Sequence, residues 1–326
     1  MPEPTRRRRL LAAGAVLGVL ALVAAGVWWN AHQREVQRQA ELLATWQGEL
    51  DAWEDGTIAL LPDPPLRLSA QVDGFATEPV EQLDEINATC ARANQHAEAV
   101  ASAPPPPGPP AELSETAANR DDVEARAAAD DDAVAAYQSA VAEPSSVLAR
   151  FCGVYPAIAQ VHADQRAALD SFGALLSACD VATTGCLPDD PSSWPEVADA
   201  VEAAYLEPTR RLAEIYAGGC PVAELEPACA ARADDADASV PLYEEYVAAL
   251  RDGDPAAAGA ARDAIAQQRE AGATAIAAAV SEAVSAAGGE PSDDAAADAA
   301  ALVRSVLTSA ENALLDADDA LVATLA

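Results

Sequence analysis

Apolar residues follow one another without interruption near the start of the chain. The run extends from Leu10 to Trp29 without a charged or strongly polar side chain. A helix rises about 1.5 Å per residue, so a run of this length can cross the roughly 30 Å apolar layer of a bilayer. Trp28 and Trp29 would then lie at one interface, where aromatic side chains are favoured. The pattern predicts a single transmembrane helix over 10–29.

The charges on either side of this run predict its orientation. Arg6, Arg7, Arg8 and Arg9 precede it and outnumber Glu3, whereas the segment 30–41 mixes basic and acidic residues. Basic residues are enriched on the cytoplasmic side of membrane helices. We therefore expect a plasma-membrane protein with residues 1–9 in the cytoplasm, lipid contact through 10–29 and an extracytoplasmic body.

A cleaved secretion signal is the alternative for this segment. Val23-Ala24-Ala25 provides a small-x-small cleavage site, and four Arg followed by two Leu also fit a twin-Arg export signal. A signal needs an apolar core of only about 7 to 15 residues. Because this run continues past Ala25 to Trp29, the pattern favours an anchor that is not cleaved.

Beyond the run, apolar residues recur every three or four positions, which is typical of helices. An amphipathic stalk from Val36 to Trp53 continues the membrane helix, and the Pro-rich stretch around residues 61–68 follows it. We expect residues 57–72 to form a loop with room for one short strand. Further helices are predicted over residues 79–101, 145–179, 193–217, 239–251, 255–287 and 292–326.

Several helix ends carry recognisable signals. Ser193 and Glu196 have the spacing of a capping box, and Asp254-Pro255 combines an N-cap residue with proline at the first helical position. Gly288-Gly289 is expected to stop the long Ala-rich helix that begins there. Small residues along that helix favour close antiparallel packing in a bundle.

The stretch Pro104 to Pro110 cannot be helical, because proline lacks an amide donor and disfavours helix in the preceding residue. We interpret it as a stiff polyproline spacer; a ligand for an SH3-type partner is the alternative. Residues 111–132 are rich in Ala and acids, and partial disorder is expected there. Together, 104–132 are predicted to be a linker.

The predicted fold is all-α: one N-terminal transmembrane helix followed by an extracytoplasmic, disulfide-stapled antiparallel helical bundle. The predicted organisation is a cytoplasmic tail (1–9), a transmembrane helix (10–29), a stalk helix and first bundle helix (30–103), a linker (104–132) and a helical bundle (133–326).

Composition narrows the function. The chain has 326 residues and a net charge of −34, which argues against binding nucleic acid. All 19 basic residues are Arg, and Ala is abundant, which together suggest the GC-rich coding sequence of a GC-rich bacterium. Without Lys, Schiff-base and Ser–Lys chemistry are excluded.

Six cysteines lie beyond the apolar run, which suits an oxidising compartment. The predicted helix 193–217 would separate the cysteines before it from those after it by roughly 35 Å. We therefore predict two local bridges, Cys179–Cys186 and Cys220–Cys229, and a tie between helices, Cys90–Cys152. The spacings fit neither a zinc site nor a C-x-x-C redox centre, and no cofactor is expected.

Motifs of the common enzyme classes are missing, and we expect no catalytic, cofactor-binding or metal-binding residues. His162 is the one histidine within a strongly patterned helix, and we interpret it as structural. Asp235, Asp237 and Ser239 imitate the start of a calcium loop, but Val240 replaces its glycine and Tyr246 its glutamate.

These observations leave three hypotheses. The first is a non-enzymatic, single-pass cell-envelope protein whose acidic helical ectodomain binds an envelope protein or acts as a spacer. The second is an ectodomain that senses a ligand or divalent cation and signals through a membrane partner; a buried polar cluster between helices would favour it. The third is a secreted hydrolase that uses His162. The oligomeric state does not follow from the sequence.

Overall fold

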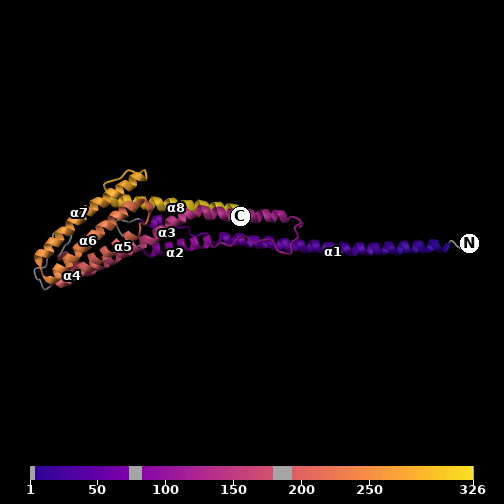
Figure 1. Cartoon of the computed structure of the whole chain (residues 1–326), viewed down its shortest axis with the longest axis horizontal. Coiled ribbons are helices and arrows are strands. Elements are labelled where there is room, and N and C mark those ends of the chain that lie inside the picture. Colours follow the sequence, from indigo (N-terminus) through magenta and orange to yellow (C-terminus); the bar gives the residue numbers. More distant parts are fainter. Residues whose placement is uncertain (1–3, 73–82, 179–192, 326) are drawn as a thin grey trace. The chain divides into compact units, whose positions relative to one another are not determined.

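The computed structural model describes residues 4–72, 83–178 and 193–325, except for the side chains of residues 4–19, 21, 174 and 176–178. The described residues contain helices and no strand, which confirms the predicted all-α class. The long helices, which can be followed in Figure 1, are α1 (Pro4–Ile58), α2 (Leu83–Ala101), α3 (Arg120–Ala178), α4 (Trp194–Val201), α5 (Glu207–Gly218), α6 (Glu226–Asp252), α7 (Pro255–Ala286) and α8 (Ala295–Leu325). Short turns of 3-10 helix occupy Ser69–Gln71 and Ala223–Leu225.

The chain divides into two compact units. Unit 1 comprises residues 1–61, 102–137 and 320–326, and unit 2 comprises residues 62–101 and 138–319. Each unit is therefore assembled from segments that are distant in the sequence, and α3 and α8 each contribute to both.

Unit 1 is built around the second half of α1. A small apolar cluster joins this helix to the segment after the prolines and to the start of α3; its buried members are Leu43, Trp46, Leu50, Leu113 and Val123. The α1 members recur at three- and four-residue spacing, as predicted for the stalk. A single continuous helix, 55 residues long, carries both the apolar run and the stalk.

The acidic half of the predicted linker is helical. α3 begins at Arg120, so the stretch 120–132, predicted to be partly disordered, belongs to a helix. Two features explain the difference: Asp121 and Asp122 lie in the first turn, where acids favour the helix dipole, and Val123 is buried in unit 1. The stretch 103–110 has no regular structure, as its prolines require.

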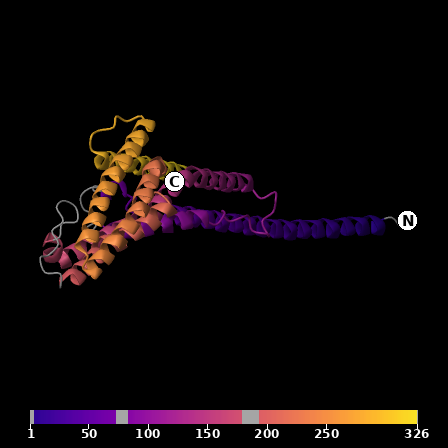
Figure 2. The same ribbon diagram turned by 60° about the vertical axis from the view of Figure 1, so that its left-hand side comes forward.

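Unit 2 has a larger apolar core between α3, α4, the following segment Glu202–Leu206, α6 and α7. Its fully buried side chains include Val197, Val201, Leu250 and Ile265, and Phe172 of α3 packs against them. α6 and α7 run side by side in both views (Figures 1 and 2). This part confirms the predicted helical bundle.

The turn between α6 and α7 explains their antiparallel pairing. Gly253 adopts a left-handed conformation with φ 66°, and the amides of Gly253 and Asp254 donate to the carbonyls of Leu250 and Ala249. This is the Schellman arrangement that ends many helices. Asp254 Oδ1 then accepts from the amides of Ala256 and Ala257, which confirms the predicted N-cap.

The predicted helix over 193–217 contains a π-helical segment, Glu202–Leu206, between α4 and α5. Pro208 cannot donate to the carbonyl of Ala204, four residues earlier, so that carbonyl needs another partner. Gln165 of α3 supplies it, with Nε2 donating at 3.0 Å. Ser193 caps α4 without a side-chain hydrogen bond, so the predicted capping box does not form.

Other helix boundaries shift more modestly. α6 begins at Glu226, directly after the 3-10 turn Ala223–Leu225, and not near Ser239 as predicted. α8 begins at Ala295, where Asp294 accepts from the amides of Ala296 and Ala297. Residues 59–72, predicted as loop with room for a strand, form turns and a 3-10 helix.

The described residues contain two of the three predicted disulfides. Cys90 is bonded to Cys152, which ties α2 to α3, and Cys220 is bonded to Cys229 across the turn between α5 and α6. The predicted bridge Cys179–Cys186 lies outside the described residues.

None of the helices in the part of the chain that the structure describes is both long and apolar enough to cross a membrane. The predicted span at 10–29 falls largely on residues whose side chains lie outside that description, as do those of Arg6, Arg7, Arg8 and Arg9.

Candidate functional site

Large apolar side chains stay exposed along one described part of α1. Trp28 and Trp29 are 65% and 59% exposed. At least half of the surface is also exposed in Leu20, Leu22, Val23, Val27 and Val36. Trp28 stacks on His32 at 5.3 Å between ring centroids, which leaves most of the indole uncovered. An exposed apolar patch of this kind marks an interaction site for lipid or protein.

The polyproline segment is docked along the second half of α1. Trp46 Nε1 donates to the carbonyl of Pro107 at 2.7 Å, and Trp53 Nε1 donates to the carbonyl of Pro104 at 2.9 Å. Proline carbonyls are free to accept because the polyproline conformation makes no internal hydrogen bonds. The segment predicted to be a spacer is therefore bound to the stalk of the same chain. The sequence did not predict the hydrogen bonds from the two indoles.

Gln39 fixes the next stretch of the same segment. Its Nε2 donates to the carbonyl of Glu112 at 3.2 Å, and its Oε1 accepts from the amide of Ser114 at 2.7 Å. Beside it, a groove of about 480 Å³ opens between α1 and residues 114–119. The groove begins near His32 and Val36, within two turns of the exposed tryptophans.

Arg126 of α3 joins this helix to α1 through hydrogen bonds with two α1 carboxylates, Glu54 and Asp51. Arg126 donates from Nε to Glu54 at 2.8 Å, and its Nη2 donates both to Glu54 at 2.5 Å and to Asp51 at 2.7 Å. Asp130, one turn later on α3, is 4% exposed and shares a hydrogen bond with Glu54, which is 7% exposed. The other oxygen of Asp130, Oδ2, has no hydrogen-bond partner.

This arrangement changes the acidity of its members. Burial, the hydrogen bond with Glu54 and the negative charge of Glu54 together raise the pKa of Asp130 to about 6, although the charge of Arg126 opposes the shift. Hydrogen bonds to Glu54 and Asp51 raise the pKa of Arg126 above its ordinary value. In the sequence, Glu54 and Asp130 are acids within polar stretches, and their residue type does not indicate that they are buried. Their burial is indicated only by their positions, which continue the apolar stripes of the two helices.

Unit 2 contains its own buried carboxylate. Glu311 of α8 is 1% exposed and accepts from both the backbone amide and the hydroxyl of Ser69, at the 3-10 turn. These hydrogen bonds hold the 3-10 turn at Ser69 against α8. The contact therefore has a structural role and does not form an open site.

His162 lies beside a polar chain at the α3–α5 contact. Burial, together with the nearby charge of Arg232, lowers the pKa of His162, while a hydrogen bond with Gln165 raises it. Gln165 in turn donates to the carbonyl of Ala204, which Pro208 leaves without its helical donor. His162 is therefore linked through Gln165 to the support of the π-helical segment.

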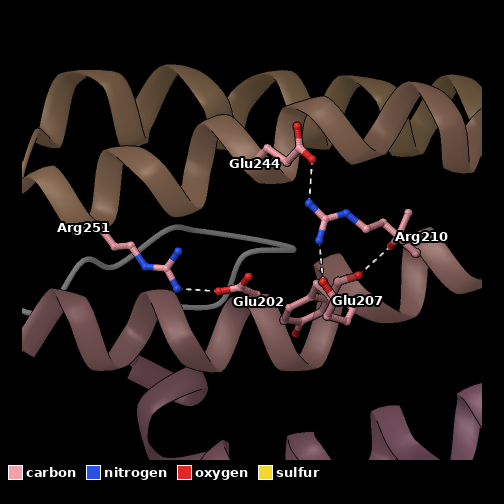
Figure 3. A network of polar contacts seen from close by, with 7 residues as sticks. Glu202, Glu207, Arg210, Glu244 and Arg251 are labelled. Carbon is pink, nitrogen blue, oxygen red and sulfur yellow. Dashed lines mark hydrogen bonds and ion pairs between the residues drawn. The ribbon is translucent and has the colours of Figure 1, made fainter.

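Ion pairs bridge the solvent side of α4, α5 and α6 (Figure 3). Arg210 pairs with Glu244 at 2.6 Å and with Glu207, and Arg251 pairs with Glu202. Arg251 also pairs with Asp199 at 2.9 Å. All of these side chains are at least one-third exposed, so each pair contributes little to stability.

The calcium-like sequence lies inside a helix. Asp235, Asp237 and Ser239 belong to α6, where the loop geometry of a calcium site cannot form. Asp235 instead accepts from Gln268 of α7 at 3.0 Å and lies against Gly272, where a Cβ would be 1.9 Å from its Oδ1. In the described ranges, no three His, Cys, Asp or Glu side chains lie together as a metal ion would require.

Comparison with known proteins adds no relative: no family model, no curated protein and no solved structure matches the chain. The function must therefore be argued from the geometry of these sites alone.

Proposed function

We propose that the protein is a non-enzymatic, single-pass membrane protein of the cell envelope, whose acidic helical body is held outside the plasma membrane to bind an envelope protein or to act as a spacer. The observation that carries this proposal is the exposed apolar surface of α1 from Leu20 to Trp29. Water is an unfavourable environment for such a surface, and lipid is a favourable one.

The sequence around this surface supports lipid as its occupant. The exposed residues belong to the apolar run 10–29, which is apolar on all sides and follows Arg6–Arg9. A helix that is apolar all round suits a lipid environment better than a one-sided protein contact. The adjoining tryptophans suit the interface between lipid and water.

Continuity of α1 supports a mechanical link. The same helix continues from the apolar run into the stalk, where Leu43, Trp46 and Leu50 are buried in unit 1. A continuous helix transmits position and orientation better than a flexible linker. The two disulfides support a compartment that is oxidising, outside the cytoplasm.

Alkaline carbonate extraction of membranes tests the anchor. The full chain is expected to stay in the membrane pellet, whereas Leu20→Arg with Val23→Arg should move it to the soluble fraction, because each charge at the centre of a span costs about 2.5–3.5 kcal/mol. Val36→Arg with Gln37→Arg is the matched control: it adds the same charge beyond the run. Equal release of the wild type and both variants would contradict the anchor.

A second candidate is an ectodomain that senses its surroundings and signals through a membrane partner. The buried carboxyl groups of Glu54 and Asp130, next to the partly exposed Arg126, favour it, because a purely spacing protein has no need of carboxyl groups in an apolar interface. Glu54 lies on the stalk, so a change in its contact with α3 would act directly on α1. Titration of Asp130 and the pH dependence of this contact test the proposal.

A further inference from the structure

The contact between α1 and α3 contains two carboxyl groups at positions that otherwise hold apolar side chains. On α1, Glu54 and Thr57 continue the buried stripe of Trp46 and Leu50. On α3, Asp130 falls between buried Val123 and Val134. Both stripes therefore meet at a polar pair.

The charges of this pair are only partly balanced. Arg126 supplies one positive charge, and it already pairs with both Glu54 and Asp51. If Asp130 were ionised as well, three carboxylates would face one guanidinium. Two carboxyl groups that share a site resist double ionisation, and one of them retains its proton.

The hydrogen bonding assigns that proton to Asp130. A protonated Asp130 can donate to Glu54, whereas two carboxylates can only repel each other. Its second oxygen, Oδ2, is buried without a donor, which is tolerable for a neutral acid and costly for an anion. Arg126 lies on the same helix, and the groups acting from α1 are Glu54 and, through Arg126, Asp51.

We propose that Asp130 and Glu54 form a proton-operated clamp between the stalk helix α1 and α3, closed when Asp130 is protonated and weakened when it loses its proton. The inference rests on the geometry of unit 1 and on neither proposed function. It would supply the second candidate with a stimulus, the acidity outside the membrane.

The direction of the effect follows from linkage. The pKa of Asp130 is higher in the folded protein, about 6, than its ordinary value of 3.8, so the folded state binds the proton more tightly. The stabilisation is complete below the ordinary value and is lost as the pH rises to about 6. Over this window the opening equilibrium should increase about tenfold per pH unit, and it should level off above it.

The test is backbone hydrogen exchange of the full chain in detergent between pH 4.5 and 7.5, corrected for intrinsic exchange. In the wild type, protection of residues 50–57 and 126–134 is expected to fall as the pH rises and to level off above pH 6. Asp130→Asn, a neutral mimic of the protonated acid, should remove this pH dependence. Asp131→Asn, an exposed neighbour, is the matched control and should keep it.

Glu54→Gln provides a second variant that keeps the size of the side chain. Without the negative neighbour, the midpoint should move below that of the wild type. Parallel profiles for the wild type and Asp130→Asn would overturn the clamp, as would a carboxyl ¹³C titration of Asp130 in the wild type with its midpoint near 4. Because these measurements use purified protein, they leave membrane anchoring untouched.

Discussion

Unit 1 and unit 2 are stabilised by different kinds of contact. Unit 2 buries a set of aliphatic and aromatic side chains from α4, α6 and α7 and contains both described disulfides. Unit 1 has a smaller apolar cluster and depends on polar contacts: two indole–carbonyl bonds and the carboxyl cluster around Arg126. Apolar packing responds little to pH, whereas the polar contacts of unit 1 depend on protonation and on individual donors. The comparison indicates that the stability of unit 1 depends on pH and on single polar side chains more than that of unit 2.

Loss of a disulfide is expected to have the largest effect and to fall on unit 2. Cys90→Ser with Cys152→Ser opens a bond between residues separated by 62 positions, which should lower the free energy of unfolding by about 4 kcal/mol. Cys220→Ser with Cys229→Ser, at a separation of 9, should lower it by about 2.5 kcal/mol. Urea unfolding followed by circular dichroism measures both, and the reverse order would contradict the loop-closure explanation.

A cavity in the core of unit 2 comes next. Leu250 is fully buried, so Leu250→Ala should lower the free energy of unfolding by about 3 kcal/mol through lost burial and an unfilled cavity. The loss should be the same at pH 5 and pH 7. A loss that changed between these values would show that unit 2 is not the pH-independent half of the comparison.

Arg126→Met tests unit 1 at its charged centre. The substitution keeps an unbranched side chain but removes the guanidinium, which leaves Glu54 and Asp130 buried without their cation and should cost about 2 to 3 kcal/mol. Since protonation relieves this cost, the loss should be smaller at pH 5 than at pH 7. Thermal melting at both values measures it, and an equal loss would contradict the assignment of the proton to Asp130.

The docked polyproline segment should contribute less. Trp46→Phe keeps an aromatic ring but removes the donor to Pro107, with an expected cost of about 1 kcal/mol. Faster proteolysis within residues 102–119 would report release of the segment. Unchanged proteolysis would mean that apolar packing holds the segment without this bond.

The surface ion pairs of unit 2 should matter least. Arg210→Met breaks the pairs with Glu207 and Glu244 that Figure 3 shows, yet both are solvent-exposed. We expect no measurable change in melting temperature at 0.15 M salt. A clear decrease would show that the network acts as a unit.

Sequence patterns were sufficient for the parts of the fold that apolar periodicity controls. The stripe through α1, the N-cap at Asp254 and the pairings of Cys90 and Cys220 followed from spacing and local chemistry. These features depend on neighbours within a few residues or on the length of one helix.

The polar contacts could not be predicted in the same way. The partners Trp46 and Pro107 are 61 positions apart, and Glu54 and Arg126 are 72 apart. Such contacts depend on which segments the fold brings together, and an acid in an acidic stretch gives no sign that it is buried. The early start of α3 was missed for the same reason, because burial of Val123 outweighs the local polarity.

The central claim is that residues 10–29 remain in the membrane and place everything after them outside. Protease treatment of intact spheroplasts that express the chain with a tag at each end tests it most directly. The account predicts that the C-terminal tag is digested while the N-terminal tag survives on a short protected fragment. Protection of both tags, or recovery of the body in the medium without residues 1–25, would contradict it.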